Sequence, residues 1–165
     1  TTLISCTCKD FQRGDLSMKK IITTLLFCLA VFIMSPISYA ADWQWISSTD
    51  VMTVSFDKDS IRKSEPNKYF AWIKYEYTES EGAKISDELK LTEPTSYELV
   101  RFEFDYKNES SRIQAVVRYS KDGTVLSNFA DEYNLARFTP IVPGSIGERN
   151  FYVTFAEYQN KYGKV

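Results

Sequence analysis

Ten consecutive residues, Lys68 to Tyr77, constrain the fold of this chain more than any other stretch. The segment has no Gly or Pro, and six of its residues are aromatic or β-branched, which is typical of a β-strand. Because side chains alternate along a strand, one face is wholly apolar or aromatic, whereas the other turns from Phe70 and Trp72 to charge at Lys74. The pattern predicts a central strand of about 33 Å, with one face on a core and the other partly covered.

The first 40 residues have the pattern of a leader rather than of a folded domain. Two lysines follow Met18, an apolar run of about 14 residues comes next, and small residues close the segment. This pattern predicts a secretory signal peptide over residues 18–40, cleaved before Ala41. A membrane anchor is the alternative, but a bilayer span needs about 20 apolar residues. Residues 1–17 are interpreted as lying upstream of the true start, and the mature form is predicted not to span a membrane.

Cleavage would leave residues 41–165 as a single domain of 125 residues. This part contains 16 basic and 20 acidic residues, and a net charge of −4 gives a nucleic-acid role no electrostatic support. All three cysteines lie before Ala41, so the domain is predicted to have no disulfide. The chain contains no His, which excludes Ser-His-Asp, Cys-His and histidine–metal sites. We therefore predict no catalytic residue, no metal and no cofactor.

Alternation of apolar and polar residues predicts further strands on both sides of the central one. In chain order the predicted strands are 42–46, 51–57, 68–77, 97–106, 112–119 and 124–129. Four residues of the fifth strand are expected to face the core, namely Ile113, Ala115, Val117 and Tyr119. Asp122 and Gly123 predict a hairpin closed by a type I′ turn. Residues 78–96, which contain Gly82 and Pro94, are predicted to be mostly loop.

The last element is predicted to be a helix. Ser145 can cap its first turn, and Glu148 three residues later completes a capping box. Four aromatic residues recur at steps of four, three and four, namely Phe151, Phe155, Tyr158 and Tyr162. They share one face of a helix, which we expect to pack on the sheet. The predicted fold is therefore α+β, an antiparallel sheet of about six strands with one C-terminal helix packed on a face.

Two groups of residues are candidates for binding a partner. The first is a basic cluster at one end of the predicted sheet and comprises Lys58, Arg62, Lys63 and Lys68. On an acidic protein it could attract an acidic segment or a glycan, and the alternative is a solvated face. The second comprises Phe70 and Trp72, which would form an apolar patch of the kind interfaces use if the helix does not cover their face.

Carboxylates offer a weaker case for chemistry. Glu103 and Asp105 project from one strand face about 6–7 Å apart, a separation that two glycosidase carboxylates could have. The alternative is a solvent face, with Arg101 alongside. Asp57 and Asp59 could begin a cation site, but Asp is also common in turns. No pocket is evident from the sequence, and the protein is predicted not to be an enzyme.

A series of short motifs runs along nearly all of residues 43–155. In order they are Trp43 to Ile46, Phe56-Asp57 with Ser60-Ile61-Arg62, Trp72 and Tyr75, Phe104-Asp105, Arg118-Tyr119 with Asp122-Gly123-Thr124-Val125, and Ile141 with Pro143-Gly144-Ser145-Ile146-Gly147-Glu148. In order and spacing they resemble the surface-adhesin protein E family of small exported bacterial proteins. The resemblance implies about six antiparallel strands with a C-terminal helix on one face. It also implies binding to host plasma and matrix proteins, as in the characterised adhesins.

The sequence departs from that family at two places. Members commonly carry a cysteine just after the Phe-Asp pair and another on the C-terminal helix, which ties the helix to the sheet. Here Tyr106 follows Asp105, and the helix offers Phe155 or its neighbours, so an aromatic contact is expected to replace the disulfide. A lipid anchor, expected for a surface adhesin, is also missing from the pattern.

Two functions follow from this reading. The first is a non-catalytic, adhesin-like module, exported to the periplasm, the medium or the outer surface, that recognises a host plasma or matrix protein or an envelope protein. The second is a periplasmic carrier or chaperone-like protein that holds an apolar ligand between sheet and helix. A pocket lined by Tyr69, Tyr75, Phe102 and Phe151 would favour the second. A closed interface between sheet and helix would favour the first.

Overall fold

The computed structural model describes residues 41–130 and 137–164 of the 165-residue chain. The predicted signal peptide and the upstream segment lie outside the described residues. Ala41–Val165 form one compact unit. In the described ranges, no helix has the length and apolar character needed to cross a membrane.

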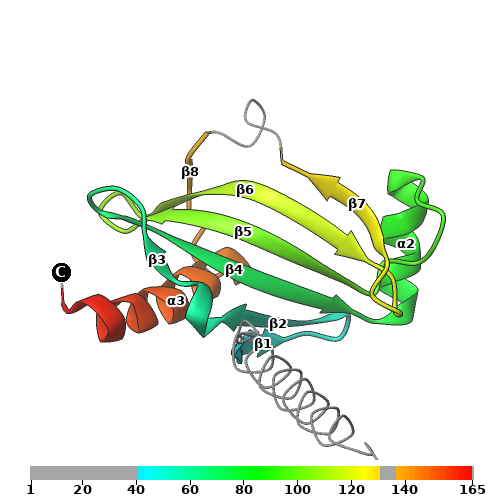
Figure 1. Ribbon diagram of the computed structural model, residues 1–165, viewed down its shortest axis with the longest axis horizontal. Coiled ribbons are helices and arrows are strands. Elements are labelled where there is room, and N and C mark those ends of the chain that lie inside the picture. Colours follow the sequence, from blue (N-terminus) through cyan, green and yellow to red (C-terminus); the bar gives the residue numbers. More distant parts are fainter. Residues whose placement is uncertain (1–40, 131–136, 165) are drawn as a thin grey trace, which may run out of the picture. The chain divides into compact units, whose positions relative to one another are not determined.

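The described strands form one antiparallel sheet (Figure 1). Its main path runs β1-β2-β4-β5-β6-β7, and two short strands pair beside it, β3 with β4 and β8 with β6. The bounds are β1 Trp43–Ser48, β2 Met52–Asp57, β3 Arg62–Lys63, β4 Lys68–Tyr77, β5 Tyr97–Asp105, β6 Ser110–Tyr119, β7 Val125–Phe129 and β8 Thr139–Pro140. The six strands of the main path are those that the alternation predicted, with shifts of one or two residues at their ends.

Strand β4 is central, as its composition predicts. It pairs with β2 along one edge and with β5 along the other. The register places Tyr69 opposite Phe104 and Ile73 opposite Val100, so the apolar rows of neighbouring strands coincide. We call this side of the sheet the inner face, and it carries the core.

Helix α3, Ile146–Tyr162, covers the inner face (Figure 1). The rings of Tyr69 and Tyr158 stack with centroids 4.9 Å apart, and those of Phe104 and Phe151 lie 5.9 Å apart. The aromatic stripe at helical spacing is therefore core packing, and the predicted α+β architecture is confirmed. The opposite side, across the sheet from α3 (Figure 1), we call the outer face.

Residues predicted from the sequence cap the start of α3 and hold the helix against the sheet. The Ser145 hydroxyl accepts from the Glu148 backbone N–H at 3.1 Å. The Glu148 carboxylate accepts from the Gly144 N–H at 2.8 Å, one residue before the position expected in a capping box. Tyr106 stacks on Phe155 with centroids 5.2 Å apart, so the aromatic contact expected between these two positions is present.

The prediction of a loop over residues 78–96 is wrong, because Glu79–Leu89 form helix α2 at one end of the sheet (Figure 1). Its buried residues are Gly82 and Ser86, one turn apart, rather than an apolar stripe. The Ser86 hydroxyl accepts from the Thr95 N–H at 2.8 Å. A Cβ on Gly82 would meet the Thr95 carbonyl oxygen at 1.9 Å, so the helix needs glycine to approach this closely.

Two local predictions in β6 and its hairpin also differ from the structure. A bulge opposite the Arg101–Phe102 step shifts the register. Ile113 lies on the inner face as predicted, but Ala115, Val117 and Tyr119 lie on the opposite face, and Val116 is buried in their place. The type I′ turn is wrong as well. Gly123 has a positive φ of 87° but Asp122 does not, and the Gly123 N–H donates to the Ser120 carbonyl at 3.1 Å. This is a type I turn followed by a glycine bulge, which a three-residue loop favours.

Candidate functional site

The space between sheet and helix is filled by side chains. Tyr69 is 0% exposed and Phe151 is 3% exposed. The Tyr69 hydroxyl donates to the Phe151 carbonyl at 3.2 Å and shares a hydrogen bond with Thr154 Oγ1 at 3.0 Å. The Tyr75 hydroxyl accepts from Asn150 Nδ2 at 2.7 Å. Burial raises the pKa of both tyrosines well above the usual value, so both hydroxyls stay protonated at physiological pH.

Two surface pockets on the described part of the chain lie away from this interface. One of about 300 Å³ is lined by Tyr77, Glu79, Glu93 and residues 94–96 beside the β6–β7 turn. The other, of about 220 Å³, lies between η1, the 3-10 turn Lys58–Ser60, and the end of α3. Neither contains any of the four residues expected to line a carrier pocket. The closed interface is the arrangement that favours a binding surface over an internal ligand site.

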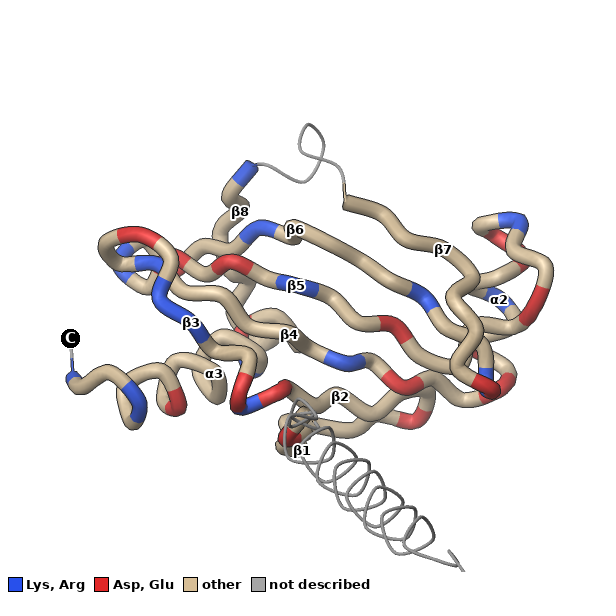
Figure 2. The backbone as a smooth tube through the Cα atoms, viewed as in Figure 1, with Lys and Arg blue, Asp and Glu red and all other residues tan. Residues whose placement is uncertain are grey.

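The predicted basic cluster does not form a single positive patch. Lys58 lies 3.4 Å from Glu157 on α3, and Lys68 lies 2.8 Å from Glu65. Arg62 donates to the carbonyl of Ile61 at 2.9 Å. Charges of both signs are interspersed along the strands and loops (Figure 2). Lys63 is exposed on β3, a two-residue strand that sequence reasoning took for part of a polar link.

The predicted aromatic pair lies on the outer face. Phe70 and Trp72 are half-buried there, on the side of β4 opposite α3. The structure adds residues that sequence reasoning did not include. The apolar members of the outer face include Trp43, Trp45, Phe70, Trp72, Tyr97, Leu99, Val117 and Tyr119. Alternation had placed Trp43 and Trp45 together, but only the register of β1 on β2 shows which face they share.

Charged groups on the outer face are held against these rings. The Lys74 ammonium lies 5.0 Å from the Trp43 ring and 3.1 Å from the Glu76 carboxylate. The Arg101 guanidinium lies 4.3 Å from the Phe70 ring. Tyr97 and Tyr119 stack with centroids 4.7 Å apart and nearly parallel planes, 8° from each other. Trp45 is the most open of the apolar side chains, at 66% exposed.

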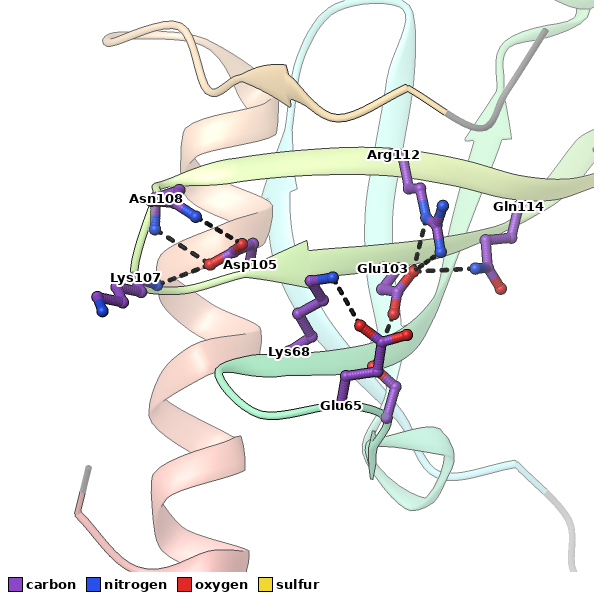
Figure 3. Close-up of polar contacts among 9 residues, drawn as sticks. Glu65, Lys68, Glu103, Asp105, Lys107, Asn108, Arg112 and Gln114 are labelled. Carbon is purple, nitrogen blue, oxygen red and sulfur yellow. Dashed lines mark hydrogen bonds and ion pairs between the residues drawn. The ribbon is translucent and has the colours of Figure 1, made fainter. Parts of the chain in front are cut away.

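The two carboxylates considered for catalysis serve the fold instead (Figure 3). Glu103 is 1% exposed, which contradicts the solvent-face interpretation. Its carboxylate accepts from Arg112 Nε at 2.6 Å, from Gln114 Nε2 at 3.0 Å and from the hydroxyl of Ser64 at 2.7 Å. Such a buried charge persists because every oxygen is engaged.

Asp105 fixes the β5–β6 turn (Figure 3). One carboxylate oxygen accepts from the backbone N–H groups of Lys107 and Asn108, both at 3.1 Å. Asp57 likewise accepts from the Asp59 N–H at 3.0 Å, which is a turn role. Among the described residues, no group of three or more side chains of the kinds that hold a metal ion comes together.

A family model described as surface-adhesin protein E matches residues 43–154, from β1 to the middle of α3. The chain belongs to the surface-adhesin protein E family. The match covers all the described strands of the sheet and the first half of the helix that covers the inner face. No curated protein and no solved structure matches the chain. Membership of the surface-adhesin protein E family indicates an adhesin-like surface protein. The outer face is therefore interpreted as part of such a protein.

Proposed function

We propose that the protein is an exported, non-catalytic adhesin-like module that binds a host plasma or matrix protein, or an envelope protein, through its outer face. Family membership supports the class of protein. All three tryptophans lie on the outer face, the side of the sheet opposite α3 (Figure 1). This observation is the main support for assigning the outer face as the binding surface.

The energetic argument rests on where the apolar groups lie. Tryptophan, tyrosine and arginine are the residues that dominate binding energy at protein interfaces. Here they lie on β1, β4 and β5, with β2 between β1 and β4; Trp45 is 66% exposed and Trp72 is half-buried. Keeping such side chains in water costs about 25 cal/mol for each Å² of apolar surface left uncovered. A partner that covers these side chains recovers this free energy, whereas α3 already covers the inner face.

The basic residues have a secondary place in this proposal. Lys68 lies at the end of β4 on the outer face, and Arg62 lies opposite Phe70 on the neighbouring strand β3. They suit the polar rim that surrounds an apolar interface centre. Rim charges affect the rate of association and its salt dependence more than the affinity.

Binding to a panel of purified plasma and matrix proteins, measured by biolayer interferometry, tests the proposal. Trp72→Ala and Trp45→Ala should each weaken binding by about 10-fold or more, as loss of an interface anchor does. Tyr152→Ala is the matched control, because Tyr152 is an aromatic residue of α3 that is 53% exposed on the other side of the domain. Circular dichroism would confirm that each variant is folded. Equal affinities for the tryptophan variants and the wild type would contradict the assignment of the outer face.

Protease treatment of intact cells tests the place of action. A surface adhesin should be cleaved in intact cells at concentrations that spare a periplasmic marker. Protection of the protein in intact cells, with cleavage only after the outer membrane is opened, would rule out a host partner and leave an envelope protein as the ligand.

A further inference from the structure

We propose that the segment recognised by the outer face is acidic, and that Arg101 is the residue on which a partner's carboxylate docks. This inference rests on the proposed function, and it specifies the chemistry of the partner. It is carried by the pairing of charges on the outer face, where Arg101, among the described residues, has neither a carboxylate nor a carbonyl oxygen as a partner.

Five cations of the described part of the chain lie on the outer face, and three of them have a carboxylate partner within the chain. Lys68 pairs with Glu65 at 2.8 Å, and Lys74 pairs with Glu76 at 3.1 Å. The third, Arg112, pairs with the buried carboxylate of Glu103. The other two, Arg62 and Arg101, have no carboxylate at ion-pair distance among the described residues. Arg62 lies opposite Phe70 and donates to the backbone carbonyl of Ile61 at 2.9 Å, whereas the charged group of Arg101 lies over the Phe70 ring.

The position of Arg101 suits recognition. It is in the middle of β5, opposite Trp72 on β4 and Ala115 on β6, with its guanidinium 4.3 Å from the Phe70 ring. A guanidinium that rests on a ring by one face keeps its N–H donors at the edges, where a carboxylate can accept two parallel hydrogen bonds. The ring contact also fixes the long side chain before a partner arrives, so less conformational entropy is lost on binding.

The surroundings favour a carboxylate within an apolar segment. Trp72, Leu99 and Val117 flank Arg101 on the same face and are half-buried. A partner that covers them removes water from around the ion pair, which strengthens the attraction between the two charges. The segment that fits is therefore one Asp or Glu with aromatic or aliphatic neighbours.

A polyanion such as a sulfated glycan fits this face less well. Binding a polyanion relies on several cations whose charge is not already compensated. Among the described residues of the outer face, three cations are paired with carboxylates and Arg62 with a backbone carbonyl, which leaves Arg101 for a ligand. A single carboxylate matches that count.

The test begins with selection of 12-residue peptides displayed on phage against the immobilised protein. Each selected peptide is then synthesised in two forms, as selected and with every Asp and Glu replaced by Asn and Gln. Affinities are measured for the wild type, for Arg101→Gln and for a matched control, Arg149→Gln, which removes an exposed arginine of α3. Backbone amide NMR spectra of the wild type locate the bound peptide without relying on a variant.

We expect acidic peptides that shift the signals of β4, β5 and β6. Their affinity should fall by about 10-fold or more in the amide form, as loss of a charge-assisted bidentate pair requires. The same loss should appear with Arg101→Gln and not with Arg149→Gln, and the two losses should not add.

Other results would overturn the inference, and they separate it from the proposed function. Outer-face peptides that bind equally well in the amide form would refute the acidic docking site and leave the outer face as the binding surface. Peptides that shift only signals elsewhere would refute both. Failure to select any peptide, together with Arg101-dependent binding of a heparin fragment, would assign the site to a glycan instead. Failure to select any peptide without heparin binding would also count against the inference.

Discussion

Replacing Tyr158 by Ala tests whether α3 is held to the sheet by its aromatic stripe. Tyr158 is 1% exposed, and its ring lies 4.9 Å from that of Tyr69 and 5.8 Å from that of Tyr106. Truncation of a buried aromatic side chain to Ala costs about 3–5 kcal/mol, because transfer free energy is lost and a cavity remains. Domains in general have a total stability of only about 5–15 kcal/mol, so the loss is a large fraction of it.

Tyr152 is the matched control, since it is the same residue type on the same helix but is 53% exposed. Both substitutions raise helix propensity by the same small amount, so the difference between the variants reports packing alone. For a domain of this size 1 kcal/mol corresponds to about 4 °C in Tm, which gives a Tm for Tyr158→Ala about 12–20 °C below that of Tyr152→Ala. Calorimetry or circular dichroism measures it. Equal melting temperatures for the two variants would show that α3 does not dock through this face.

Three further outcomes are expected. Gly82→Ala should lower the free energy of unfolding by about 1–3 kcal/mol in a urea titration, since the added Cβ would overlap the Thr95 carbonyl oxygen, and an unchanged value would contradict that contact. Glu103→Ala should cost about 3–5 kcal/mol because it removes the buried carboxylate partner of Arg112, whereas Glu76→Ala, which breaks an exposed pair, should cost about 0–1 kcal/mol. Burial raises the pKa of Tyr75, so stability should hold below about pH 10 and fall above it as unfolded tyrosines ionise. Tyr75→Phe should show a smaller alkaline loss.

The fold was largely predictable because its signals are local. Alternation marks a strand wherever one face meets a core, and the aromatic residues of α3 recur at helical spacing. Helix α2 was missed because its buried side is made of Gly82 and Ser86, which carry no hydrophobic signal. The close approach of Thr95 that makes these small residues necessary is a tertiary contact. The pattern of the isolated segment does not contain it.

The binding surface was predictable only in part. Phe70 and Trp72 were chosen from alternation, but whether their face is covered depends on which side α3 packs, and alternation does not reveal it. The sequence pointed to Arg101 only as a neighbour of Glu103. Whether Arg101 has a carboxylate partner depends on how every other charge on the face is paired, and the sequence does not show that pairing. Glu103 itself was misjudged because Ser64, which helps to bury it, is 39 residues away in the sequence.

The order of the strands has a consequence for how the chain acquires its structure. Every strand of the main path pairs with the main-path strand that precedes it, so the sheet can grow by adding one hairpin at a time as the chain emerges. Helix α3 is last in the chain, yet it contacts β1, the first strand. Until those final residues arrive, the aromatic inner face of a complete sheet has no cover. The interval before docking is the period in which the nascent protein is most exposed to aggregation and most dependent on chaperones.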